Sequence, residues 1–170
     1  MIDNKLSMTI LSNREMYPVV FTGIESMLQS CEIDKETLDN IKTAVSEVLT
    51  NCTNHAYPNK PGVVHVYMSL IDNNTFTISI RDHGCGIADI QKAMTPLYTT
   101  GDPEKHSGMG FSVMECFVDK VKVRSIEKQG TTVKLIVKLN NNLKKTNEPS
   151  GSFFLYHGIS TILFITHGEI

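Results

Sequence analysis

Glu47 and Asn51 are the first side chains in this sequence that could carry chemistry. A spacing of four residues places them on one face of a helix, one turn apart. A carboxylate in that position can act as a general base, and an amide oxygen beside it can ligate a hard cation such as Mg²⁺. Asn54 falls close by, and the stripe lacks Lys and Arg, whereas a solvated face usually carries charges of both signs. Taken alone, the helix is also compatible with an ordinary exposed polar stripe.

Two glycine-containing motifs could complete a nucleotide site. Asp82-His83-Gly84-Cys85-Gly86 directly follows a predicted strand, so its carboxylate could accept a hydrogen bond from the adenine amino group while the glycines admit a ligand. Ser107-Gly108-Met109-Gly110 begins an apolar segment, and the amides and dipole of a helix N-terminus favour phosphate. Each motif alone is also compatible with a plain turn, and neither the Walker A nor the Rossmann pattern is present.

The elements that must position these residues follow from hydrophobic periodicity. Alternation predicts strands, and apolar residues recurring at helical spacing predict helices, with Ser12-Asn13 and Asp34 as N-caps. The predicted strands cover residues 5–11, 63–71, 75–81, 121–126 and 131–139, and the predicted helices cover 13–29, 34–55 and 108–118. Because strands group with strands and helices with helices, we expect an α+β fold: a two-layer sandwich in which helices cover a mixed, mostly antiparallel sheet.

Composition limits the possible functions. A chain of 170 residues with 41% hydrophobic residues suits a single domain, expected over residues 1–139. Its net charge of -2 disfavours direct nucleic-acid binding, and its four scattered cysteines show no metal or redox spacing. Residues 140–152 have the composition of a linker, and residues 153–170 form an apolar tail of unknown role that is too short for a membrane span. Since the N-terminus lacks a signal-peptide core, we expect a cytoplasmic protein.

The order of the motifs is more specific than any one of them. A Glu-x-x-x-Asn helix, a hairpin, Asp-x-Gly-x-Gly, a polar segment, Gly-x-Gly at a helix start and Gly-Thr-Thr at a strand start follow one another over residues 5–139. This arrangement resembles the Bergerat-type ATP-binding fold shared by gyrase, Hsp90, histidine kinases and MutL. Within that superfamily, residues 46–51, 80–87, 96–100 and 107–111 are similar to those of the anti-sigma F factors, the serine-protein kinases of sporulation.

The resemblance implies roles for individual residues. Asn51 would ligate the Mg²⁺ that bridges the ATP phosphates, and Glu47 would be the catalytic base. Asp82 would bind the adenine amino group with support from Thr131. The resemblance further implies a lid over residues 95–107 and ATP or ADP contacts at Gly84, Gly86, Thr100, Lys105, Ser107, Gly108, Met109 and Gly110.

The resemblance also implies a function and partners. The protein would be a dimeric, ATP-dependent serine kinase that inhibits a sporulation sigma factor and phosphorylates an anti-anti-sigma protein. Two residues depart from the family pattern, because His106 stands where the family usually has Arg, with Lys105 as the candidate substitute, and Val19 replaces a partner-contacting Arg. The weaker γ-phosphate contact implied by His106 favours, as an alternative, a nucleotide-dependent sigma-binding module with little or no kinase activity, whereas Val19 implies a partner affinity that differs from the family norm. A histidine kinase catalytic domain is disfavoured because it would need a helical segment bearing a phospho-acceptor histidine, and a nucleotide-free α+β domain stays open.

Overall fold

The computed structural model describes residues 4–95 and 109–139. Its sheet contains five strands in the order β1-β2-β3-β5-β4, and every neighbouring pair is antiparallel. The strands are β1 (Asn4–Leu11), β2 (Val63–Ile71), β3 (Thr75–Asp82), β4 (Lys120–Ile126) and β5 (Gly130–Lys138). The helical elements are η1 (Arg14–Met16), α1 (Tyr17–Leu28), α2 (Lys35–Asn51), η2 (Cys52–Ala56), α3 (Ile90–Ala93) and α4 (Gly110–Phe117).

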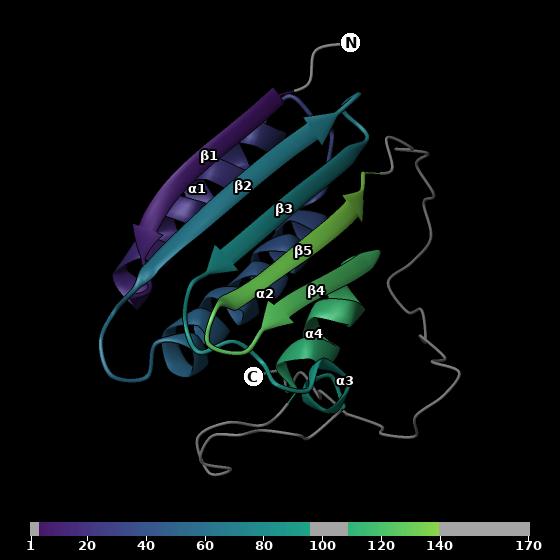
Figure 1. The fold of residues 1–170 in the computed structure, drawn as a ribbon. Helices are drawn as coiled ribbons and strands as arrows, with labels where there is room; N and C mark the ends of the chain where they lie inside the picture. The colour runs from purple at the N-terminus through teal and green to yellow at the C-terminus, as the bar shows by residue number, and fades with distance from the viewer. Residues whose placement is uncertain (1–3, 96–108, 140–170) are drawn as a thin grey trace, which may run out of the picture.

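The helices lie on one face of the sheet and leave the other face open (Figure 1). Side chains alternate along each strand, so one set faces the helices and forms the core. On β2, for example, Val64, Val66, Met68 and Leu70 are all buried, whereas Val63 and Tyr67 on the opposite face are exposed. The α+β two-layer sandwich predicted from the sequence is therefore confirmed, and the sheet is antiparallel throughout the part of the chain that the structure describes.

Helix α2 has the clearest sequence determinants. The Asp34 carboxylate caps it by accepting a hydrogen bond from the Thr37 N–H at 2.7 Å, as the sequence predicts. Its apolar stripe is buried against the core, and a Lys42–Glu25 ion pair joins it to α1. The predicted helix to residue 55 is divided, because regular α geometry ends at Asn51 and the wider π turn η2 carries the chain to Ala56.

Other element boundaries differ modestly from prediction. Asn13 caps the first helical segment as expected, but that segment begins with the 3-10 turn η1 before α1 starts at Tyr17. The short helix α3, capped by Asp89, was not predicted, and α4 begins at Gly110 rather than Gly108. The linker expected over 140–152 and the tail expected over 153–170 lie outside the described residues, as does most of the predicted lid.

Candidate functional site

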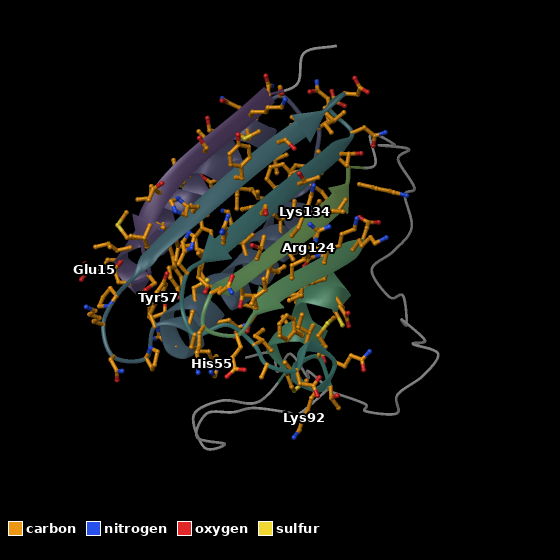
Figure 2. The ribbon with its side chains drawn as sticks, viewed as in Figure 1. Glu15, His55, Tyr57, Lys92, Arg124 and Lys134 are labelled. Carbon is orange, nitrogen blue, oxygen red and sulfur yellow. The ribbon has the colours of Figure 1, made fainter. Side chains whose placement is uncertain are left out.

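A cavity of about 740 Å³ lies on the helical side of the sheet, at the end where α2, η2 and α4 meet β3 and β5. Glu47, Asn51, Asp82, Gly110 and Thr131 all line it, although they come from four separate regions of the sequence. Figure 2 shows His55 and Lys92, two further lining residues, at this end of the molecule. The fold therefore brings these five of the predicted site residues around one space.

Asp82 is the best-organised polar group in the cavity. Its side chain is only 4% exposed, and its Oδ1 accepts hydrogen bonds from the N–H groups of Gly84 at 2.9 Å and Thr131 at 3.1 Å. Its Oδ2 has a weaker partner, the Cys52 thiol at 3.9 Å. Burial raises the pKa of the Asp82 carboxyl, although the two N–H groups act in the opposite direction. One oxygen is thus fixed by the protein, while the other retains capacity to accept a hydrogen bond from a ligand.

Gly84 and Gly86 shape the loop after β3. A side chain at Gly84 would collide with the carbonyl oxygen of Ala56, and one at Gly86 would collide with that of Ile126. Gly86 also has φ +68°, a left-handed conformation that glycine adopts without strain. The missing side chains therefore allow the loop to pack against η2 and β4. Of the two glycines, Gly86 lines the cavity and Gly84 does not. The access of adenine to these glycines stays a prediction.

Ser125 on β4 holds this loop to the β4–β5 hairpin, a role that the sequence analysis missed. Its hydroxyl accepts a hydrogen bond from the Ile87 N–H at 2.7 Å and donates to the Gly130 carbonyl at 3.1 Å. It also lies 2.9 Å from the Thr131 hydroxyl. Since the Thr131 N–H in turn donates to Asp82, Ser125 positions the carboxylate through β5.

Glu47, Asn51 and Gly110 converge at the start of α4. A Cβ atom built on Gly110 would stand 3.1 Å from Glu47 Oε2 and 3.6 Å from Asn51 Nδ2. Glycine at this position therefore leaves the α4 N-terminus close to both polar side chains. Partial burial raises the pKa of Glu47, which brings a carboxylate closer to the range useful for proton transfer.

The described residues contain no group of three or more His, Cys, Asp or Glu side chains that could hold a metal ion. A metal site that also uses oxygens of a bound ligand needs no such group. The Asn51 amide fits such a site, because it lies in the cavity and none of the described residues hydrogen-bonds it. Mg²⁺ commonly binds through one or two protein oxygens, substrate phosphates and water.

The remaining predicted contacts have different positions. Met109 precedes α4 and is 45% exposed, and it does not line the cavity. Thr100, Lys105, Ser107 and Gly108 lie outside the described residues. Arg14, from η1, lines the cavity although no nucleotide contact was predicted for it. Across residues 4–95 and 109–139, none of the helices combines the length and the apolar character needed to cross a membrane.

Comparisons with known proteins identify the family to which the sequence is similar. The sequence profile of the histidine kinase-like ATPase domain matches residues 12–137. An anti-sigma F factor of Clostridium acetobutylicum is 40% identical over 133 residues, which cover 78% of this chain and 92% of that protein. An anti-sigma F factor of Halalkalibacterium halodurans is 42% identical over 129 residues, covering 75% of this chain and 86% of that protein.

One solved structure supports the fold alone. The RsbU and RsbW domains of a Mycobacterium tuberculosis protein superpose with a TM-score of 0.57 at 18% identity. The match covers 80% of this chain and 32% of that one.

Proposed function

Because the chain belongs to the histidine kinase-like ATPase domain family and, within it, to the anti-sigma F factors, we propose that it is an ATP-dependent protein-serine kinase that also inhibits a sigma factor. Its substrate would be a serine of an anti-anti-sigma protein, and its inhibitory target a sporulation sigma factor held by a homodimer. The names of the relatives support the sigma-factor partner, and the matching ATPase domain supports nucleotide binding.

The observation that carries the kinase proposal is the convergence of Glu47, Asn51 and Gly110 in the cavity that also contains the Asp82 carboxylate. ATP would lie with its adenine amino group at Asp82 Oδ2 and its phosphates near Gly110. Mg²⁺ held through Asn51 would neutralise phosphate charge when bound. Glu47 would orient the substrate serine and accept its hydroxyl proton as the γ-phosphoryl group passes to the serine oxygen and ADP leaves.

A phosphotransfer assay with ATP, Mg²⁺ and the cognate anti-anti-sigma protein tests the proposal. Glu47→Gln preserves side-chain size but removes the base, so phosphoserine formation should fall at least about a hundredfold. ATP affinity should change little, because Glu47 is not proposed to bind the nucleotide. Glu36→Gln, on the first turn of the same helix, is the matched control and should retain full activity.

The result would also separate the two functions. Undiminished phosphotransfer in Glu47→Gln would remove this residue from catalysis. Tight ATP binding and sigma-factor capture without any phosphoprotein in the wild type would instead identify a nucleotide-dependent binding module. Failure of ATP and Mg²⁺ to raise the melting temperature would contradict both, because a ligand that binds only the folded state must stabilise it.

A further inference from the structure

The face of the sheet that the helices leave open carries positively charged side chains and no negatively charged ones on its strands. Alternate residues of β3, β5 and β4 point away from the helices, and six of these are exposed basic side chains. We call them the basic patch: Arg81, Lys120, Lys122, Arg124, Lys134 and Lys138. Figure 2 shows Arg124 and Lys134 on neighbouring strands of this face. None of the outward-facing residues on the five strands is acidic.

The strand register brings these like charges together. Lys122 is directly opposite Lys134, while Arg124 and Arg81 lie opposite Thr132 from its two sides. Directly opposed side chains have Cβ atoms about 4.5–5.5 Å apart, and like charges at that separation destabilise a sheet. No described carboxylate forms an ion pair with any of them. Within residues 4–95 and 109–139, this repulsion is therefore not compensated by an ion pair.

Protection of the sheet edge explains only part of this pattern. Lysines commonly occupy edge strands because they discourage pairing with another chain, and β4 is an edge strand. Arg81 and Lys134, however, lie on the interior strands β3 and β5, where no free edge needs protection. The chain as a whole has a net charge of -2, so the patch is a local feature and not part of a generally basic surface.

We propose that the basic patch binds an acidic segment of a partner protein. Carboxylates one turn apart on a helix are about 5–6 Å apart at their Cβ atoms, close to the spacing of the patch across its strands. The patch lies on the face of the sheet opposite the nucleotide cavity, because Arg81 and Asp82 are adjacent on β3 and point in opposite directions. This contact goes beyond the proposed kinase and anti-sigma activities and requires no nucleotide.

Other occupants fit the surface less well. Single-stranded nucleic acid usually stacks on aromatic side chains, and the exposed Tyr67 lies on β2, separated from β5 by β3. A second copy packed face to face through the same patch would oppose positive charge with positive charge.

Fluorescence anisotropy with a fluorescein-labelled helical peptide rich in Glu tests the proposal on the full chain. The charge-reversed protein Lys122→Glu/Lys134→Glu should bind the peptide about tenfold more weakly, because two attractive contacts become repulsive. Lys35→Glu/Lys60→Glu changes the same number of exposed lysines outside the patch and is the matched control, which should bind like the wild type. Added salt should weaken the wild-type complex. Unchanged ATP binding and melting temperature would verify that the patch variant is folded.

Equal loss of peptide binding in both variants would overturn the proposal. It would also be overturned if duplex DNA or phosphatidylserine vesicles bound more tightly than the peptide in a patch-dependent way. Loss of a homodimer in the patch variant with unchanged peptide binding would assign the surface to a second copy instead. Should the charge-reversed protein not fold, Lys122→Gln/Lys134→Gln provides the same comparison with a smaller expected loss.

Discussion

Replacing Asp82 by Asn should separate ATP recognition from folding. The amide oxygen that Asp82→Asn introduces could still accept the two backbone N–H groups of Gly84 and Thr131, so the loop would keep its anchor. The NH₂ group would replace Oδ2, however, and it cannot accept a hydrogen bond from the adenine amino group. ATP affinity should therefore fall while the protein stays folded.

The magnitude follows from the interaction that is lost. A hydrogen bond to a charged group contributes about 1.5–3 kcal/mol, so ATP affinity should fall about tenfold to a hundredfold. Guanine presents an acceptor at O6 where adenine presents a donor, so GTP should lose less affinity than ATP, or gain some. Titration calorimetry with both nucleotides in the presence of Mg²⁺ measures the two effects.

The stability of the nucleotide-free protein should change in the other direction. Burial raises the folded-state pKa of Asp82 above its unfolded value, so folding stability falls as the pH rises between these two values. At neutral pH the buried charge therefore costs stability, and the neutral Asp82→Asn side chain removes that cost. The melting temperature without nucleotide should be unchanged or higher, and its increase on adding ATP should be much smaller.

Asp89→Asn is the matched control for this prediction. It removes the same charge from a residue lining the same cavity, and Asn serves as well as Asp at a helix N-cap. If folded Asp82→Asn bound ATP within about twofold of the wild type, Oδ2 would not be the adenine acceptor. If Asp89→Asn lost as much affinity as Asp82→Asn, charge in the cavity rather than a specific hydrogen bond would explain the effect.

Three further predictions concern the loop and the base. Ser125→Ala should lower the free energy of unfolding by about 1–3 kcal/mol in denaturant titrations, because its partly buried partners lose their hydrogen bonds. An unchanged midpoint would contradict its positioning role. Gly86→Ala should destabilise the protein by more than about 1 kcal/mol, because φ is +68° and the Ile126 carbonyl occupies the space that the new methyl group would need. A higher melting temperature of the variant would refute this. Burial raises the pKa of Glu47, and the base acts only when it is deprotonated. The phosphotransfer rate should therefore rise with pH, and the apparent pKa of this rise should be above that of an ordinary glutamate. A rate already maximal at about pH 4 would exclude Glu47 as the base.

Local patterns were sufficient to predict most of the fold. Alternation of apolar and polar residues predicts β2, and its buried set confirms the register of the pattern. The Asp34 cap and the apolar periodicity predict the start and buried face of α2. The division of this helix at Asn51 has no equivalent local signal. At the end of η2, the Ala56 carbonyl accepts a hydrogen bond from the backbone N–H of Cys85, which lies in a loop distant in the sequence.

The same distinction applies to the site. The predicted pairing of Asp82 with Thr131 came from family resemblance, and the structure adds that the Thr131 backbone N–H makes the contact. Ser125 could have been found from the strand period alone, because it continues the inward-facing positions of Val121 and Val123 on β4 and is the polar member of that set. The need for glycine at position 86 could not have been found in this way, because it depends on the Ile126 carbonyl, which belongs to a hairpin distant in the sequence.

Through its two oxygens, Asp82 would also link the stability of the sheet to the proposed ligand binding. Because Oδ1 is held from both the loop after β3 and the start of β5, any ligand that bound Oδ2 would stabilise the junction of these elements. Oδ2 remains a usable acceptor because its hydrogen-bond partner among the described residues is a thiol, a weak donor that would compete poorly with an adenine amino group. A side chain that binds a ligand this way cannot be optimised for the empty protein, since the group that would best satisfy Oδ2 would also occupy the position of the ligand.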